Sequence, residues 1–327
     1  MNNFNILFTS AGRRVSLVRS FRTALDSLGL QGTLVTADLQ KNAPAPFVAD
    51  VRELVPRVTD PTYISTLLDI CRRHSIRLLV PLIDTELHLL APHRQSFAEI
   101  GVTLLVSSEE VNHLTLDKRS TCEFFRSADI PTPAILDPAT ILAAKITSYP
   151  YLLKPAQGSC SAGVTKIRNA EELRFFLNYV QEPIVQELIQ GEEYTLDILV
   201  DFDGKVRCVV PRLRIETRAG EVSKGMTVNN PAIVAAGKKV AEALPGALGC
   251  ITAQCFLTPE NEIVFIEINP RFGGGFPLAC AAGADFPKWI IQMVRGEEPE
   301  IALDGWQDGL VMLRYDEAIF VTKELVE

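Results

Sequence analysis

Short apolar runs alternate with helical patterns along the first third of the chain. Residues 4–9 predict a buried strand, and the turn at 10–12 leads into a stretch with apolar residues at spacings of three and four, which predicts a helix. Further strands are expected at 34–37, 78–80 and 102–106, with a helix over 63–73. Strands that alternate with helices indicate a mostly parallel sheet. We therefore expect residues 1–113 to form an α/β domain.

The pattern changes after Asp117. Two short strands, around a loop that contains glycine, are expected between two helices: helices at 118–128 and 171–180, strands at 151–154 and 164–167. Residues 114–183 are therefore expected to form a small movable lid. Residues 184–327 form the third expected domain, of mixed strands and helices: strands at 184–189, 194–200, 206–211, 251–258, 263–269 and 310–315, helices at 231–243 and 285–294.

A candidate metal site lies in the apolar run 265–271. A strand has a side-chain period of two, so Glu267 and Asn269 face the same way, roughly 7 Å apart. If residues 259–262 form the loop of a hairpin, Gln254 lies opposite Glu267, with Cβ atoms about 5 Å apart. These oxygen ligands suit Mg²⁺ or Mn²⁺ and are poor ligands for zinc. The alternative is a polar, solvated strand face.

Composition restricts the classes of partner. The chain has 327 residues and a net charge of −8, which disfavours nucleic acid as a partner. The lack of a run of 18 apolar residues argues against a membrane span. No export signal is expected at the N-terminus. The odd number of cysteines, 7, without a CxxC pair argues against a disulfide scaffold or a zinc cluster. We therefore expect a cytoplasmic protein.

A candidate phosphate site lies at residues 154–163. Lys154 ends an apolar run, where an unpaired charge is costly, and a loop of small residues follows. Backbone N–H groups of such a loop can approach a phosphate closely. The alternative is an ordinary flexible turn, and no GxxxxGK[ST] sequence is present. The candidate loop residues are Gly158, Ser159, Ser161 and Gly163.

Other polar residues are open to two interpretations. The strand end at 186–193 can pair with the edge of a base, or is only an acidic strand end. The arginines and lysine between 212 and 224 can hold an anion, or form a solvated run. Asp84 and Glu86 follow a strand of the α/β domain, where they can bind substrate or cap the next helix. The turn at Arg14 can hold an anion at a helix N-terminus.

In this order, the motifs resemble those of the ATP-grasp superfamily, most closely its carbamoyl-phosphate-synthase-like members and other carboxylate–amine ligases. The resemblance implies an ATP-grasp fold, mixed α/β and α+β, with an N-terminal Rossmann-like (pre-ATP-grasp) parallel-sheet domain. It implies that Lys118 and Lys154 contact the phosphates of ATP and that Glu193 binds its ribose. The implied adenine-binding strand is Glu187, Leu188 and Ile189. The implied metal ligands are Gln254, Glu267 and Asn269.

The resemblance also implies a reaction. We expect an ATP- and Mg²⁺-dependent ligase that joins a small carboxylate to an amine or thiol through an acyl phosphate. Alternatives are a carboxyphosphate-forming or kinase-like enzyme, and an ATP-binding regulatory protein with little catalysis. Homodimers are common in the superfamily, so one is allowed here, whereas no membrane partner is expected. The residues expected to act in catalysis are Arg271, Lys154 and Arg214; the candidate substrate residues are Arg14, Asp84, Glu86, Arg212 and Lys224.

Overall fold

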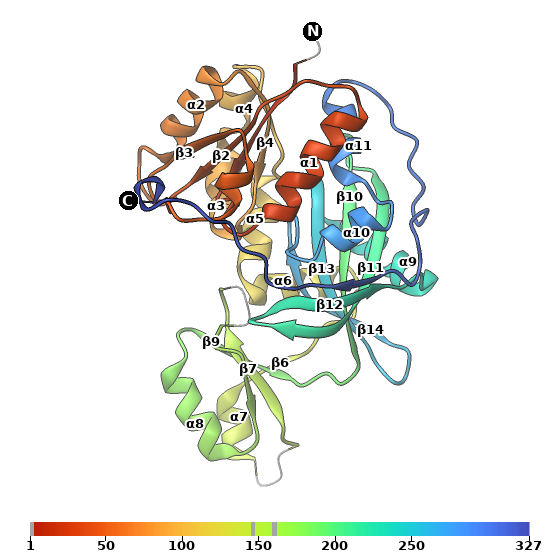
Figure 1. The fold of residues 1–327 in the computed structure, drawn as a ribbon. Coiled ribbons are helices and arrows are strands. Elements are labelled where there is room, and N and C mark those ends of the chain that lie inside the picture. Colours follow the sequence, from red (N-terminus) through yellow and green to blue (C-terminus); the bar gives the residue numbers. More distant parts are fainter. Residues whose placement is uncertain (1–2, 145–147, 159–161, 327) are drawn as a thin grey trace.

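A parallel sheet forms the N-terminal part of the computed structural model, which describes residues 3–144, 148–158 and 162–326. Its five strands run in the order β3-β2-β1-β4-β5, and every neighbouring pair is parallel, which confirms the predicted α/β architecture (Figure 1). The strands are β1 (Asn5–Thr9), β2 (Leu34–Asp38), β3 (Val51–Leu54), β4 (Ile76–Pro81) and β5 (Thr103–Leu104). The accompanying helices are α1 (Val15–Ser27), α2 (Tyr63–Arg73), α3 (Asp84–Leu90), α4 (Arg94–Ala98) and α5 (Glu109–Leu116).

An antiparallel sheet of six strands forms the main body, in the order β14-β13-β10-β11-β12-β15. The strands are β10 (Glu192–Val200), β11 (Val206–Arg218), β12 (Glu221–Thr227), β13 (Gly249–Leu257), β14 (Ile263–Asn269) and β15 (Val311–Leu313). The helices are α9 (Pro231–Ala243), α10 (Pro277–Ala281) and α11 (Phe286–Val294). β11 is longer than the expected 206–211 because it continues into a hairpin with β12.

One apolar core joins the first two sheets. Phe21 of α1 contacts the ring of Phe8 in β1 and, on its other side, that of Phe272 beyond β14. All three rings are almost fully buried in the same cluster. The parallel sheet is therefore packed firmly on the main body.

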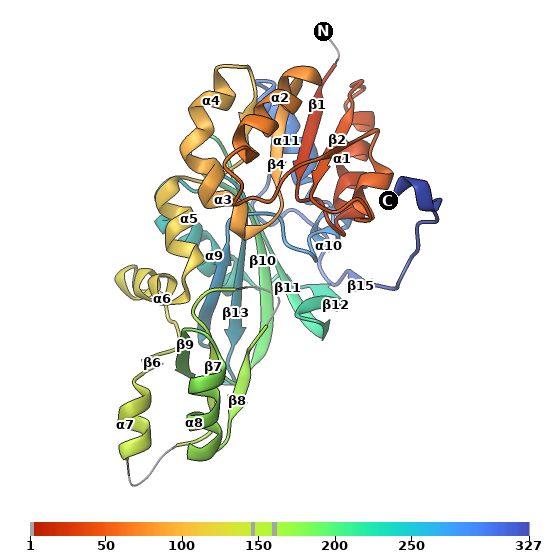
Figure 2. The same ribbon diagram turned by 90° about the vertical axis from the view of Figure 1, so that its left-hand side faces the viewer.

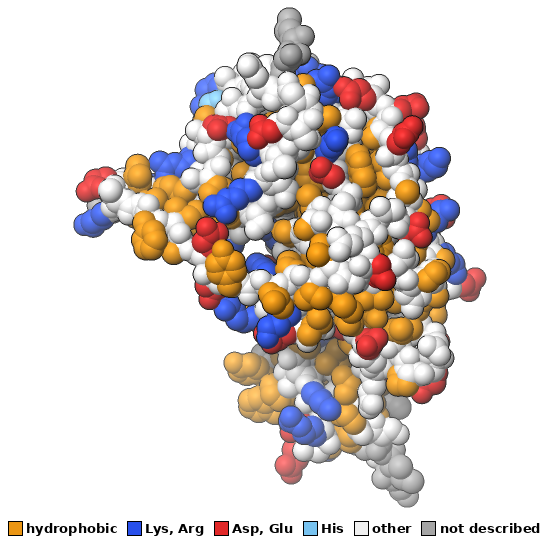
Figure 3. All heavy atoms as spheres, turned by 45° about the vertical axis from the view of Figure 1, so that its right-hand side comes forward, with side chains coloured by type: hydrophobic (Ala, Val, Ile, Leu, Met, Phe, Trp, Pro, Cys, Tyr) orange, Lys and Arg blue, Asp and Glu red, His pale blue; other side chains and the backbone are white. Residues whose placement is uncertain are grey.

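A small lobe lies below the main body (Figures 2 and 3). Its sheet has the order β6-β9-β7-β8 and its own apolar core. The elements are β6 (Ile135–Leu136), α7 (Pro138–Ala143), β7 (Tyr151–Pro155), β8 (Thr165–Ile167), α8 (Ala170–Tyr179) and β9 (Pro183–Glu187). β9 pairs with β7 and β6 although it follows the expected boundary at 183. We therefore propose that this lobe extends through Glu187.

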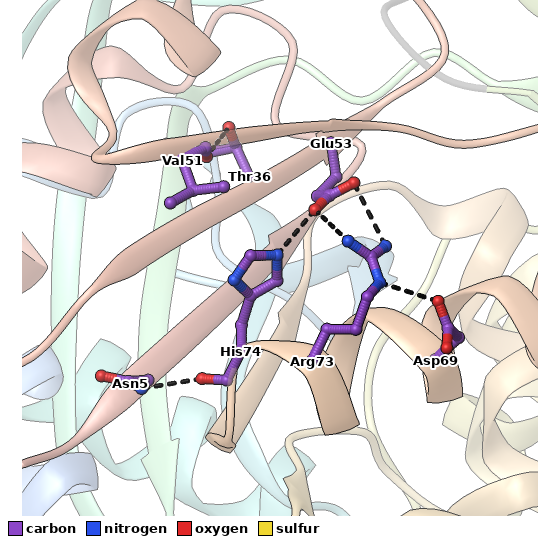
Figure 4. Close-up of polar contacts among 7 residues, drawn as sticks. All are labelled: Asn5, Thr36, Val51, Glu53, Asp69, Arg73 and His74. Atoms are coloured by element: carbon purple, nitrogen blue, oxygen red, sulfur yellow. Dashed lines mark hydrogen bonds and ion pairs between the residues drawn. The ribbon is translucent and has the colours of Figure 1, made fainter.

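A polar network fixes α2 to the edge strand β3 (Figure 4). Arg73 and His74, at the C-terminal end of α2, both contact Glu53 of β3, at 2.8 and 2.6 Å. Burial acts to raise the pKa of Glu53, but Arg73 and His74 lower it below its usual value. The network therefore ties helix to strand most strongly when Glu53 is ionised.

No helix of the described residues is long and apolar enough to cross a membrane. On the face shown in Figure 3, acidic and basic side chains are interspersed and do not form a patch of one sign.

Candidate active site

A polar row crosses four strands of the main sheet. Glu267 of β14 lies opposite Gln254 of β13, as predicted. Gln254 in turn pairs with Thr195 of β10, and Thr195 pairs with Arg212 of β11. Paired residues of neighbouring strands point to the same face. The sheet register alone therefore places an acid, an amide, a hydroxyl and a guanidinium in one line.

The hairpin of β13 and β14 has the expected Gln254–Glu267 pair, but its loop length differs from the expected one and a bulge compensates for the difference. Leu257 pairs with Ile263, so the loop contains residues 258–262 and is one residue longer than expected. Cys255 pairs with Phe265 and Gln254 with Glu267, which leaves Ile266 as the extra residue of a β-bulge. The bulge cancels the longer loop, and the expected pair forms.

A second row runs beside the first. Asn269 of β14 pairs with Thr252, and Thr252 pairs with Asp197 of β10. Asn269 therefore lies two residues from Glu267 on the same face, and both line one cavity with Gln254. Among the described residues no three His, Cys, Asp or Glu side chains form a metal cluster. One carboxylate and two amides are hard oxygen donors, a set that fits Mg²⁺ and not zinc.

Gln254, Glu267 and Asn269 form the candidate metal set, and two cavities meet at its first two residues. The first has a volume of about 370 Å³ and the second about 290 Å³. The residues that line both are Lys118, Gly158, Arg214, Gly220, Gln254 and Glu267. The two cavities are therefore adjacent at Glu267, where a ligand in one would lie next to a ligand in the other.

The second cavity lies between the small lobe and the main sheet. Among its lining residues, Lys154 gives the strongest indication of the kind of ligand that the cavity would bind. The side chain is buried, with a relative exposure of 6%, and lines the cavity from β7. Burial lowers its pKa, and the nearby Glu267 offsets part of this effect. A buried cation beside an open cavity is a favourable site for a bound anion.

Lys118 stands at the junction. It is the first residue of α6 (Lys118–Ser127), and Asp117 caps that helix by accepting a hydrogen bond from the Arg119 N–H. Its Nζ donates to the Gly158 carbonyl at 2.9 Å and lies 3.9 Å from Glu267 Oε1. One lysine thus connects the glycine loop to the metal set.

Most of the other residues predicted to bind the nucleotide line the second cavity. Glu187, Leu188, Ile189 and Glu193 all line it. Glu187 accepts a hydrogen bond from the Ala134 N–H at 2.6 Å. Gly158 lines the cavity, whereas Gly163 does not. Ser159 and Ser161 lie outside the described residues.

Glu193 and Arg214 form an ion pair of 3.2 Å across β10 and β11. Burial raises the pKa of Glu193, while Arg214 counteracts the shift. Arg214 also donates to the Gly220 carbonyl at 3.0 Å. These contacts hold Arg214 at the border of the two cavities.

The first cavity lies between the main sheet and the parallel-sheet unit, and Arg271 connects them. Its Nη2 donates to Asp84 Oδ2 at 2.7 Å and lies 3.3 Å from Asn269 Oδ1. Burial acts to lower the pKa of Arg271, but Asp84 outweighs it and the pKa is raised. Arg271 therefore stays charged beside Asn269, one of the candidate metal ligands. Arg14 and Arg212 line the same cavity.

Two candidate substrate residues do not line either cavity. Glu86 is fully buried and accepts hydrogen bonds from Tyr63 Oη at 2.7 Å and from the Leu82 N–H at 2.9 Å. Burial raises its pKa. It closes the first turn of α3, which is the helix-capping alternative. Lys224 is exposed and pairs with Glu216 at 2.7 Å. We therefore exclude both from the proposed site.

Sequence reasoning missed part of the first cavity. Glu221 lines it from β12, a strand hidden in what was considered a basic run. The loop Gly273–Gly275 also lines it. Three consecutive glycines after Arg271 were the signal that could have found this wall, because glycine marks a close approach of the backbone to other groups.

Two family models match the chain. Residues 6–105 match the family described as "PylC-like, N-terminal domain". Residues 115–275 match the family described as "ATP-grasp domain". The second match contains the candidate metal set, both lysines and the glycine loop.

Curated relatives are similar over part of their length. The chain is 27% identical over 169 residues to a D-alanine–D-alanine ligase of Fusobacterium nucleatum subsp. nucleatum, covering 49% of this chain and 58% of that protein. It is 25% identical over 264 residues to a formate-dependent phosphoribosylglycinamide formyltransferase of Bacteroides thetaiotaomicron, covering 73% of this chain and 64% of that protein. The chain thus spans less than two thirds of either relative.

The fold is similar to solved structures. One is the biotin carboxylase domain of 2-oxoglutarate carboxylase from Hydrogenobacter thermophilus, with a TM-score of 0.72 and 21% identity. The match covers 92% of this chain and 71% of that one, which was crystallised with MgADP, ADP and bicarbonate. This likeness supports the predicted fold.

Proposed function

We propose, because the chain belongs to the ATP-grasp superfamily, that it is an ATP- and Mg²⁺-dependent ligase that joins a small carboxylate to an amine. The observation that carries this proposal is the meeting of two cavities at Lys118, Gln254 and Glu267. One cavity would hold the nucleotide, and the other would hold the group that receives its γ-phosphoryl.

The second cavity supports the nucleotide assignment. Its apolar lining, including Leu188, Phe256 and Ile266, can enclose a base. Glu193 offers a carboxylate for ribose hydroxyls. Lys154 supplies a buried positive charge, and Lys118 supplies a second at the junction, where the phosphates would end. Two cations there would stabilise the negative charge of a triphosphate.

The metal set supports phosphoryl transfer. Gln254, Glu267 and Asn269 would hold Mg²⁺, which when bound offsets the charge of the phosphates during transfer. Arg271, held by Asp84 next to Asn269, presents a guanidinium to the same point. These residues favour transfer to a substrate carboxylate by position and charge. The resulting acyl phosphate would then be attacked by the amine, releasing phosphate.

The small lobe would exclude water from the acyl phosphate. It carries Lys154 and Gly158, and it joins the main sheet between β9 and β10, at Gly191 among others. Gly191 has a φ of 155°, and a Cβ there would lie 2.3 Å from the Leu257 carbonyl oxygen, so only glycine fits. We propose that closure of the lobe around such joining residues completes the site.

A reducing compartment also fits this chain. Six described cysteines are free thiols, and five of them are buried. This supports a cytoplasmic location, where small carboxylates, amines and ATP are available.

The test is phosphate release from Mg-ATP against amino acids and small carboxylates, singly and in pairs, with the product identified by mass. Release that requires one particular pair, together with a product equal to their condensation, would support the ligase. Release with a carboxylate alone would favour the kinase-like alternative. ATP binding without release across the whole panel would contradict the proposed function.

A further inference from the structure

The first cavity contains a buried guanidinium that is only partly satisfied. Arg212 has a relative exposure of 1%. Its Nε and Nη2 donate to the two carboxylate oxygens of Asp197, at 2.6 and 3.1 Å, and Asp197 is fully buried. Its Nη1 is also buried, yet it has no hydrogen-bond partner among the described residues. A charged donor left without a partner is costly, so an occupant of the cavity would relieve it.

The glycine loop at the wall of the first cavity packs directly against this nitrogen. A Cβ on Gly275 would lie 2.3 Å from Arg212 Nη1 and 2.4 Å from Val222 Cγ1. Any larger residue would therefore press on the guanidinium or displace it. Arg212, Gly273, Gly274 and Gly275 line the first cavity together. The Asp197 carboxylate and the close-packed Gly275 backbone together fix the guanidinium of Arg212 at the wall of the first cavity.

The position of Arg212 separates it from the transfer chemistry. It lines the first cavity but not the second, unlike Arg214, which lines both. Two strands, β10 and β13, lie between its strand and that of Glu267. An anion held at Nη1 is therefore distinct from the phosphate at the junction.

We propose that Arg212 Nη1 binds a carboxylate that is not consumed in the reaction, so that one substrate of this enzyme carries an additional carboxylate. This inference rests on the proposed function, and it narrows the substrate class. Two sources have this chemistry: an amino acid whose amino group is acylated, and a dicarboxylic acid of which one carboxylate is activated. In both cases the product keeps the carboxylate that Arg212 holds.

The kinetic test compares the active acid with its amide. For the substrate pair found by phosphate release, each carboxylate that survives into the product is replaced by a carboxamide. We expect kcat/KM to fall about 10- to 100-fold, the usual effect of losing a charge-assisted hydrogen bond, mainly through KM. If the effect appears for the amine substrate, the retained carboxylate belongs to an amino acid that is acylated. If it appears for the activated acid, that acid is a dicarboxylic acid. Equal use of acid and amide would overturn the proposal.

Two variants test the residue itself. Arg212→Lys and Gly275→Ala are each expected to raise KM for the acid about 10- to 100-fold, to leave KM for ATP within about twofold, and to abolish the preference for acid over amide. Arg207→Lys is the matched control, because Arg207 is on the same strand, pairs with Asp201 at 3.1 Å and lines neither cavity. A preference that persists in both variants would overturn the assignment.

A binding measurement keeps the inference separate from the proposed function. Protein with Mg²⁺ and a non-hydrolysable ATP analogue is titrated calorimetrically with L-alanine, L-glutamate and succinate, each beside its amide or monoamide. At least one acid should bind about tenfold more tightly than its amide, and Gly275→Ala should remove the difference. This result without turnover would reject the ligase but keep the receptor. Equal or absent binding of all probes would reject the receptor.

Thermal unfolding accompanies each variant, because a weakened partner for the buried Asp197 can impair folding. If Arg212→Lys does not fold, Gly275→Ala decides the outcome, since it removes neither Arg212 nor its buried partner Asp197.

Discussion

We expect the charge of Lys154 to have two opposite effects: it lowers the stability of the free protein, and it strengthens the binding of Mg-ATP. Its side chain is buried, and burial lowers its pKa. Replacing it by methionine, which has a similar volume, removes a desolvated charge from the apoprotein. It also removes one of the two cations proposed to hold the phosphates. Lys154→Met should therefore raise the melting temperature of the free protein and weaken the binding of Mg-ATP.

The magnitude follows from burial and chain length. Replacement of a whole buried ion pair by apolar groups of similar volume often stabilises by about 1–4 kcal/mol. Lys154 is a single charge whose cost the nearby Glu267 partly offsets, so we expect a value at the lower end, about 1–2 kcal/mol. The entropy of unfolding for a chain of this length, about 0.7 kcal/mol/K, converts this to about 1.5–3 °C. At 100 times its Kd, Mg-ATP adds about 2.7 kcal/mol to the wild type. A variant that binds 100-fold more weakly gains only about 0.4 kcal/mol at the same concentration.

The assay is thermal unfolding with and without Mg-ATP. Without nucleotide the variant should melt above the wild type, and with nucleotide the order should reverse. Lys166→Met, on the exposed face of β8 in the same sheet, is the matched control and should change neither value by more than about 1 °C. The stabilisation should shrink as pH rises towards 10.5, because there the unfolded lysine also becomes neutral.

Two results would refute the reasoning. A lower melting temperature for the free variant would mean that Lys154 is stabilised by its surroundings and not penalised by them. An unchanged shift on adding Mg-ATP would mean that Lys154 does not contact the nucleotide.

Three further predictions concern individual carboxylates. Glu267→Gln should lower turnover about 100- to 1000-fold and raise the Mg²⁺ requirement in a phosphate-release assay; wild-type turnover would reject the metal set. Asp84→Asn should lower turnover about tenfold by freeing its arginine partner, whereas Glu86→Gln should keep turnover within about twofold but lower the melting temperature; equal turnover losses would contradict this distinction. Burial acts to raise the pKa of Glu53, but its cationic partners lower it, so its stabilisation is present above pH 4.5 and lost as pH falls through the lowered pKa. Glu53→Gln should flatten the acid side of the melting temperature against pH, and an unchanged acid side would argue against the network.

The hairpin of β13 and β14 shows how far periodicity can predict the placement of candidate site residues. Strand alternation placed Glu267 and Asn269 on one face, and the turn residues placed Gln254 opposite Glu267, as the structure confirms. The loop length was wrong by one residue, and the bulge at Ile266 compensated for the error. A bulge depends on twist and on packing between strands, so no local pattern in this sequence indicated it.

Asp84 and Glu86 show where sequence reasoning ended. Both follow β4, and the sequence could not decide between substrate binding and helix capping for either. The structure divides the roles: Asp84 holds Arg271 in the first cavity, and Glu86 caps α3. The decision depends on a residue 187 positions away along the chain. The loop 273–275 was missed for the same reason, since its role in the first cavity depends on contact with Arg212, which is distant in the sequence.

The bulge at Ile266 makes two consecutive residues, Ile266 and Glu267, face the second cavity. In a regular strand, neighbours point to opposite sides, yet Ile266 and Glu267 both line the second cavity. Ile266 contributes apolar wall, and the next residue, Glu267, contributes the proposed metal ligand. Loss of Ile266 would leave a regular ladder with Gln254 still opposite Glu267, so this pair would survive while part of the apolar wall disappeared. A deletion of one residue here would therefore change the lining of the second cavity without changing the Gln254–Glu267 pair that borders it.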